Sequence, residues 1–121
     1  MHFQHLTYWQ DKAKNSAIET RLFINGAYCD AADNATFETV NPATQQTLAN
    51  VARGKQADVD RAVQAARAVF ERGDWSQASP AQRKAVLNTL ADLMERHSEE
   101  LALLETLDTG KPIRHSLRDD I

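Results

Sequence analysis

Cysteine, glycine and proline are scarce in this sequence of 121 residues, which contains one Cys, four Gly and three Pro. The single cysteine, Cys29, cannot form an internal disulfide, which is typical of proteins from a reducing compartment. No G-x-G-x-x-G stretch is present to wrap a dinucleotide. No apolar run approaches transmembrane length, and the first residues lack the apolar core of a signal peptide. We therefore expect a cytoplasmic protein.

An excess of positive charge is also missing, because the formal net charge is −3. Without a basic surface field, neither nucleic acid nor an anionic membrane is an expected partner. The proportions of hydrophobic and charged residues, 42% and 26%, are those of an ordinary globular domain.

Three short strands are predicted in the first half of the chain. Residues 22–24 favour a strand, and Asn25-Gly26 supplies the two positive-φ residues of a tight type I′ hairpin turn. Residues 36–40 and 47–52 are two further β-rich runs, separated by the turn-forming sequence NPATQQ.

Helical periodicity begins after Gly54, where apolar residues form one stripe through about Arg72. Ser79 and Pro80, with Gln82 placed to close a capping box, open a second helix. We expect this helix to bury one apolar side, made of Val86, Leu87, Leu90, Leu93 and Met94. A third helix is expected with Ser98 as its N-cap and two acids in its first turn, Glu99 and Glu100.

The stretch LETLDTGKPI could be a phosphate loop or the end of this third helix. A phosphate loop needs GxxxxGK[ST], and the sequence fails at both ends, with Glu105 and Pro112 in the critical positions. Gly110 stands where a left-handed residue ends a helix, and Pro112 prevents simple continuation. We therefore predict a helix stop.

An apolar stripe of Ile113, Leu117 and Ile121 follows the stop at helical spacing and runs to the end of the sequence. Nothing in the sequence predicts a cover for it, so we expect a missing partner segment. The stripe leaves a second hypothesis open, a stand-alone helical module that binds a partner helix. Continuation of the reading frame past Ile121 would distinguish a chain that lacks a partner segment from a stand-alone module.

The remaining candidates for chemistry are isolated. Cys29 has no histidine near it in sequence, which favours a partly buried structural thiol over a nucleophile. His2 and His5 could hold a metal weakly, but no cysteine or spaced acid accompanies them, which favours a solvated terminus.

Taken together, the segments LFINGAYCDA, FETVNPATQQTLANVA and LETLDTGKP resemble the N-terminal part of the aldehyde dehydrogenase superfamily. The resemblance runs from about Leu22 to the end and implies an α/β fold, with a short β-hairpin layer followed by three or four helices. Residues 21–121 would then be an incomplete N-terminal part of the cofactor-binding domain. Residues 1–20 would be an arm, in which Tyr8 and Trp9 on a polar background favour a short helix.

The resemblance also implies an activity: NAD- or NADP-dependent oxidation of an aldehyde, here an aminoaldehyde of putrescine breakdown, to the acid. In the family a cysteine thiolate attacks the aldehyde, a hydride passes to the nicotinamide, and a glutamate-activated water releases the product. The implied partners are the remainder of the enzyme chain and further copies, as a dimer or tetramer.

No catalytic or cofactor residue can be carried over. Cys29 stands in GAYCDA and not in the family's Gly-rich cysteine loop, and Lys111-Pro112 lacks the Ser-Glu of the family's Lys-Pro-Ser-Glu motif. We therefore expect the chain to be inactive and without cofactor on its own. Gln45 also replaces the glycine usual in the family's NPATG turn.

A monovalent cation is the one site feature that the resemblance places on residues of this chain. Several members bind such an ion through main-chain carbonyls that correspond to Thr39, Val40 and Asp108. A solvated turn is the alternative at these positions, since a further ligand would come from sequence outside the chain.

Overall fold

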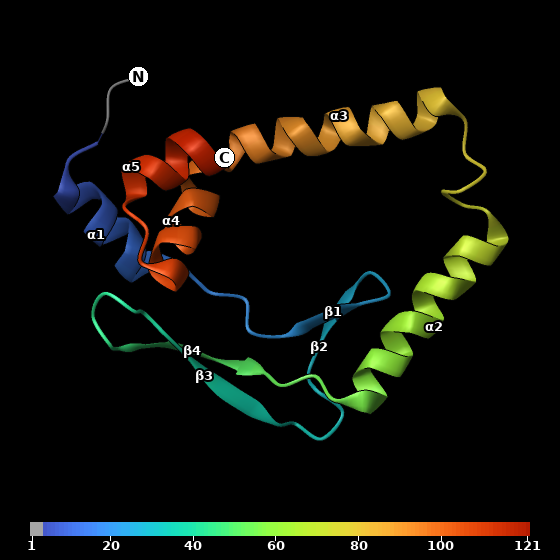
Figure 1. Cartoon of the computed structure of the whole chain (residues 1–121), viewed down its shortest axis with the longest axis horizontal. Helices are drawn as coiled ribbons and strands as arrows, with labels where there is room; N and C mark the ends of the chain where they lie inside the picture. Colours follow the sequence, from blue (N-terminus) through green and yellow to red (C-terminus); the bar gives the residue numbers. More distant parts are fainter. Residues whose placement is uncertain (1–3) are drawn as a thin grey trace. The chain divides into compact units, whose positions relative to one another are not determined.

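The structure is a computed structural model that describes residues 4–121, so His2, which the sequence places in a solvated terminus, lies outside the described residues. Figure 1 shows helices and short antiparallel strand pairs in the predicted order. The elements are α1 (Leu6–Asn15), β1 (Leu22–Ile24), β2 (Ala27–Cys29), β3 (Thr36–Val40), β4 (Thr47–Ala52), α2 (Gln56–Arg72), α3 (Pro80–Arg96), α4 (Ser98–Thr109), α5 (Ile113–His115) and the π-helix η1 (Ser116–Asp120). Four strands form where three were expected, because the predicted hairpin supplies two of its own.

The chain divides into two compact units. One combines the N-terminal residues through Glu19 with Thr39–Ala49 and Asp92–Ile121, and the other combines Thr20–Glu38 with Asn50–Ala91. Among residues 4–121, no helix has both the length and the apolar character needed to cross a bilayer.

The β1–β2 hairpin has the predicted turn. Asn25 and Gly26 have φ values of 53° and 78°, and Phe23 pairs with Tyr28 across the strands. Their rings meet edge to face with centroids 5.1 Å apart. Positive φ at both central residues matches the right-handed twist of the strands, which is why Asn-Gly is favoured there.

Helix α3 begins as predicted. The Gln82 N–H donates to Ser79 Oγ at 3.2 Å, and the Ser79 N–H donates to Gln82 Oε1 at 2.9 Å. These reciprocal bonds form the capping box and satisfy two N–H groups at the helix start.

The expected burial of the α3 stripe is wrong for this chain. Its five apolar side chains, Val86, Leu87, Leu90, Leu93 and Met94, are 40–56% exposed. Periodicity marks the side of a helix that is able to pack, whereas burial also requires a second layer to pack against. Within residues 4–121, no element covers this side.

Helix α1 is tied to the first turn of α4. The Tyr8 hydroxyl and the Lys12 ammonium both donate to Glu99 Oε2, each at 2.6 Å, and Trp9 is buried. The bond from Lys12 is the main reason that the pKa of Glu99 lies below its usual value. The predicted Ser98 cap is wrong, because α4 already begins at Ser98 and His97 occupies the N-cap position without a side-chain cap bond.

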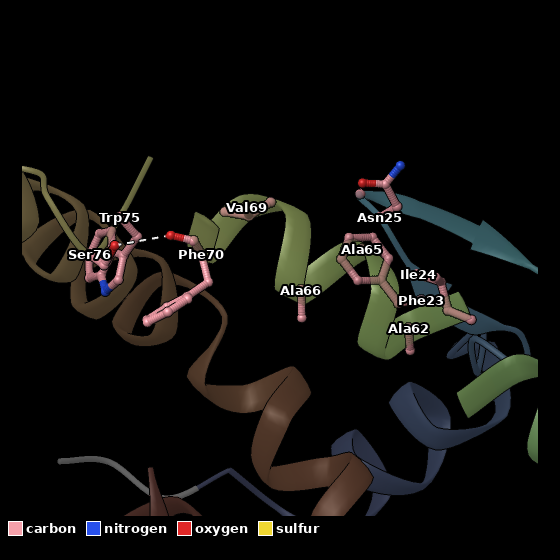
Figure 2. Close-up of a pocket in the computed structure, with 11 residues that line it drawn as sticks. Phe23, Ile24, Asn25, Ala62, Ala65, Ala66, Val69, Phe70, Trp75 and Ser76 are labelled. Atoms are coloured by element: carbon pink, nitrogen blue, oxygen red, sulfur yellow. Dashed lines mark hydrogen bonds between the residues drawn. The ribbon is translucent and has the colours of Figure 1, made fainter. Parts of the chain in front are cut away.

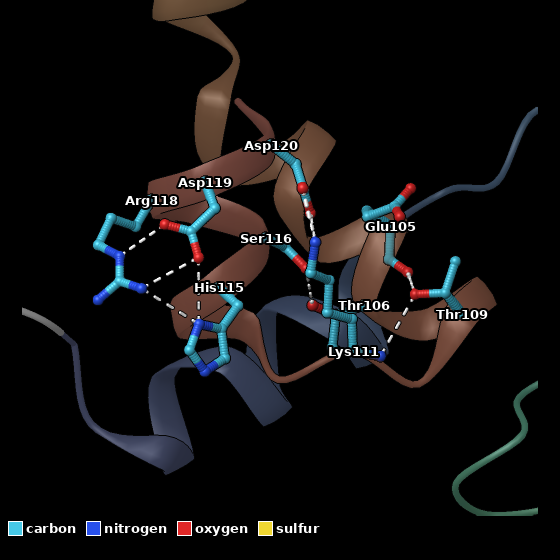
Figure 3. A network of polar contacts seen from close by, with 9 residues as sticks. All are labelled: Glu105, Thr106, Thr109, Lys111, His115, Ser116, Arg118, Asp119 and Asp120. Carbon is cyan, nitrogen blue, oxygen red and sulfur yellow. Dashed lines mark hydrogen bonds and ion pairs between the residues drawn. The ribbon is translucent and has the colours of Figure 1, made fainter.

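Helix α4 stops at Gly110 as predicted, with φ of 77° and its N–H bonded to the Thr106 carbonyl at 3.0 Å. The chain then folds back through α5 and η1, where the hydroxyls of Thr106 and the fully buried Ser116 lie 3.0 Å apart (Figure 3). This return half-buries Ile113 and Leu117. The expectation that the last apolar stripe has no cover is therefore wrong for those two residues, whereas Ile121 stays 40% exposed.

Candidate functional site

The structure brings two of the three predicted cation ligands together. Thr39 is near the end of β3 and Asp108 lies in the last turn of α4, and Thr39 Oγ1 donates to Asp108 Oδ1 at 3.2 Å. Val40 follows Thr39 as the last residue of the strand and is 44% exposed. A strand end and a helix end, 69 positions apart in sequence, thus meet at one place.

The turn after β3 also lies against the end of α4. A Cβ added to Gly110 would stand 3.0 Å from Pro42 Cγ, so a side chain there would press on the proline ring. The turn itself is held by the Gln45 N–H, which donates to the Asn41 carbonyl at 2.8 Å, and Gln45 takes a φ of 63°. Gln45 therefore adopts the left-handed conformation that glycine adopts without strain.

The chemistry of the place where Thr39 and Val40 meet Asp108 suits a weakly held cation better than a transition metal. No group of three or more His, Cys, Asp and Glu side chains suited to a metal occurs within residues 4–121. Main-chain carbonyls are hard, neutral oxygen donors, and the carbonyl end of α4 carries partial negative charge.

Lys111 is engaged and does not resemble the lysine of a phosphate loop. Its ammonium forms an ion pair with the Asp120 carboxylate, with a contact of 2.6 Å to Oδ1 (Figure 3). That hydrogen bond raises the pKa of Lys111. The stretch around it is a helix stop, as the sequence predicted.

Cys29 is half-buried, as predicted for a structural thiol. Its Sγ lies 3.9 Å from Arg61 Nη2, and the same nitrogen donates to Asp58 Oδ1 at 2.9 Å. The guanidinium is therefore already paired with a carboxylate. No histidine within residues 4–121 bonds to the thiol, so a base for a nucleophilic cysteine is lacking there.

Asp58 is the most constrained ionised side chain that the sequence prediction missed. It is 3% exposed and accepts bonds from the Lys55 N–H at 3.0 Å, the Ala32 N–H at 2.9 Å and Arg61. The Lys55 bond is the largest cause of its lowered pKa. Asp58 is at the third position of α2, where a carboxylate often caps the helix start, so a signal was available. Its role is to hold the β2–β3 loop against α2.

His97 and His115 each contact an acid that is close in sequence. His97 lies 3.3 Å from Glu100, and His115 lies 3.2 Å from Asp119. Asp119 also accepts two bonds from Arg118 (Figure 3). The hydrogen bonding from Arg118, and to a smaller extent the contact with His115, lowers the pKa of Asp119 to about 2. Each histidine is thus paired with an acid on its own helical segment, and the two pairs do not form an acid–base site.

An apolar groove of about 570 Å³ lies between the β1–β2 hairpin and α2. Figure 2 shows Phe23 and Ile24 on one side, small α2 residues along the floor, and Phe70 and Trp75 at the far end. The walls are largely apolar, with Asn25 and Ser76 as the polar side chains. The residues that line the groove include no His, Cys, Asp, Glu, Lys or Arg, so they offer no acid, base or nucleophilic thiol.

Comparison with known proteins gives consistent matches. The profile of the aldehyde dehydrogenase family matches residues 28–121. The NADP/NAD-dependent aldehyde dehydrogenase PuuC of Escherichia coli K12 is 75% identical over 121 residues, which are 100% of this chain and 24% of that protein.

Solved structures give the same result. The γ-glutamyl-γ-aminobutyraldehyde dehydrogenase of Burkholderia cenocepacia J2315 matches with a TM-score of 0.93 and 49% identity, over 95% of this chain and 23% of that one. The indole-3-acetaldehyde dehydrogenase of P. syringae, in complex with NAD⁺, matches with a TM-score of 0.90 and 49% identity, over 93% and 23%. The chain thus spans about a quarter of the length of these relatives.

Proposed function

Because the chain belongs to the aldehyde dehydrogenase family, we propose that it supplies the N-terminal part of an NAD- or NADP-dependent enzyme that oxidises an aldehyde to a carboxylic acid. The proposed substrate is γ-glutamyl-γ-aminobutyraldehyde or a related aminoaldehyde of putrescine breakdown. The observation that carries the proposal is the 75% identity to PuuC over the whole chain. The Burkholderia structure, whose protein is named for that substrate, supports it.

The chain's own residues do not fit the nicotinamide cofactor. No glycine-rich phosphate loop is present in the sequence, and Lys111 is held by Asp120. Cys29 lies beside a guanidinium that is already paired, and no histidine within residues 4–121 bonds to the thiol. We therefore assign the reaction to residues that this chain does not contain. We assign to this chain a structural role, as the first layer of the cofactor domain.

The cation forms part of the proposal. We place a monovalent ion on the carbonyls of Thr39, Val40 and Asp108, where the Thr39–Asp108 bond joins the strand end to the negative end of α4. An ion there should raise the thermal midpoint of a holoenzyme carrying this segment in K⁺ or Na⁺ above that in choline chloride at equal ionic strength. Asp108→Ala, which removes the bond to Thr39, should reduce the difference. Equal midpoints in all three salts would exclude the ion.

We propose that the remainder of the enzyme chain covers the exposed apolar sides and that the complete enzyme is a cytoplasmic dimer or tetramer. The unpaired thiol Cys29 supports the reducing compartment. The alternative, a stand-alone helix-binding module, is weakened because two of the three residues on its proposed binding stripe, Ile113 and Leu117, are half-buried within the chain.

A chimera tests the proposed activity. The matching N-terminal residues of E. coli PuuC are replaced by this chain, and formation of NADH or NADPH is followed with γ-glutamyl-γ-aminobutyraldehyde. We expect turnover by the chimera and none by the chain alone. A Cys29→Ser chimera is the matched control and should retain turnover, since the thiol takes no part. A folded chimera without activity would contradict the proposal. Turnover that is lost only in the Cys29→Ser chimera would show that Cys29 takes part in the reaction, which would contradict its assignment to residues outside this chain.

A further inference from the structure

The turn residues Asn25 and Gly26 are the one Asn-Gly pair in the sequence, and they lie at an unusually open place. Both are exposed, and nothing lies within 4 Å of the position that a Gly26 Cβ would take. Figure 2 shows the Asn25 amide pointing away from Phe23 and from α2. Within residues 4–121, no hydrogen bond holds this amide or the Gly26 N–H.

The other asparagines are held in ways that Asn25 is not. Asn15 donates its amide to the Asp11 carbonyl at 2.8 Å, and Asn41 accepts the Ala43 N–H at 2.9 Å and precedes Pro42, which has no N–H. Asn34 shares the positive φ, but the N–H that follows it is bonded to the Asp33 carboxylate at 3.0 Å. Asn50 and Asn88 lie inside β4 and α3, where the ladder or helix fixes the backbone.

We propose that Asn25 is a site of spontaneous deamidation. The Gly26 backbone nitrogen attacks Asn25 Cγ, a new C–N bond closes a five-membered succinimide, and the side-chain nitrogen leaves as ammonia with the Gly26 proton. Water then opens either carbonyl of the ring and gives aspartate or isoaspartate. The step consumes one water and releases one ammonia, with no oxidation or reduction.

The attack requires the backbone at Asn25 to rotate out of the turn, and the hairpin permits this. Strands β1 and β2 have three residues each and pair with each other alone, as a two-stranded sheet. An isolated two-stranded hairpin is marginally stable, so its turn opens at low cost. A Gly nucleophile also has no side chain to obstruct the approach.

The product would alter the groove that Asn25 and Gly26 border. Aspartate places a negative charge at the rim of an apolar surface lined by Phe23 and Phe70. Isoaspartate also inserts a methylene into the main chain between Ile24 and Ala27, which are paired across the turn. Because strand register sets which face each side chain takes, this insertion would disturb the Phe23–Tyr28 pair.

Peptide mapping tests the site. The chimera that carries this chain is incubated in mildly alkaline buffer and digested, and the peptides from residues 1–121 are analysed by mass spectrometry and by enzymatic methylation of isoaspartate. We expect Asn25 to lose its amide severalfold faster than Asn15, Asn34 and Asn41 in the same sample. An Asn25→Asp variant preserves the turn and has the charge of the deamidated product. It therefore marks the product's position in isoelectric focusing, and the wild-type band should move towards that position during incubation.

Two controls keep the result decisive. Asn25→Gln would need a six-membered ring and should remove most of the isoaspartate. The incubation is repeated in urea, where the bonds that protect Asn15 and Asn34 are lost and the rate advantage of Asn25 over them should narrow. Retention of the Asn25 amide while Asn34 or Asn15 is modified would overturn the proposal. So would isoaspartate that accumulates equally in the Asn25→Gln variant.

Discussion

At the scale of single residues, Asp58 shows how one carboxylate can define a junction. Its two oxygens satisfy the N–H groups of Lys55 and Ala32, at 3.0 and 2.9 Å, and pair with Arg61. The two N–H groups belong to the start of α2 and to the loop after β2, so the side chain fixes the two segments together. A buried carboxylate is tolerated here because donors surround it.

Asp58→Asn should lower the urea midpoint of the chimera at neutral pH, because an amide presents one acceptor and adds donors where N–H groups already point. The folded pKa of Asp58 lies below its unfolded value, mainly through the Lys55 bond. The carboxylate therefore stabilises fully above the unfolded pKa of about 3.9, and the stabilisation is lost as pH falls through the folded pKa. Midpoints measured from pH 7 to pH 2.5 should converge for wild type and variant at the acid end. Asp60→Asn, which removes a charge at an exposed position and keeps an oxygen that can accept the bond from Gln56 Nε2, is the control and should change little.

Gln45 carries a second residue-scale prediction. At its φ of 63° an L-residue is strained, at a cost of about 1 kcal/mol or more. Glycine removes that strain but adds unfolded-state entropy worth roughly 0.4–1 kcal/mol. Gln45→Gly should therefore be neutral or stabilising by a few tenths of a kcal/mol, whereas β-branched Gln45→Val should destabilise. Thermal denaturation of the chimera gives both values, and a loss of stability with glycine would show that the Gln45 side chain makes a needed contact.

At the scale of elements, the capping box of α3 can be isolated experimentally. Ser79→Ala removes the acceptor of the Gln82 N–H and should destabilise the chimera by about 1 kcal/mol. Ser98→Ala is the matched control, because Ser98 is the first residue of α4 and not its cap, and should stay within about 0.5 kcal/mol. Urea midpoints for the pair measure the contrast. Equal losses at both positions would mean that the Ser79 bond is not the source of stability.

The elements that the sequence predicted correctly are those set by neighbours in the chain. The Asn25-Gly26 turn, the Ser79 cap and the Gly110 stop each depend on one or two residues whose φ or hydrogen bonding is restricted. The resemblance paired Thr39 with Asp108, which pattern alone would not have done. The contacts that were missed, Tyr8 and Lys12 with Glu99 and Thr106 with Ser116, join polar groups that are common on any helix surface. The sequence around these residues carries no periodic or conformational signal that would indicate which residue each of them contacts.

At the scale of the whole molecule, the described chain has much apolar surface and little core. Among the described residues, the buried apolar ones are Trp9, Ala31, Ala102 and Leu103. By contrast, the α3 stripe and the aromatic walls of the groove are about half exposed, including Phe23 at 63% and Phe70 at 60%. Each large aliphatic side chain that is buried contributes roughly 1.5–3 kcal/mol, so a few uncovered ones equal the net stability of a small domain.

We therefore predict that the 121-residue chain alone is partly ordered or self-associated and becomes well ordered when the remainder of the enzyme covers these sides. Light scattering coupled to size exclusion should show a mass that rises with concentration, and amide exchange should be slow in few segments. Leu90→Glu places a charge in the middle of the exposed α3 stripe and should shift the mass towards the monomer. Asn88→Glu, on an exposed residue outside the stripe, adds the same single negative charge and should not. A monomer at all concentrations with slow exchange throughout would show that the chain is a complete folding unit, and would restore the interaction module as the better hypothesis.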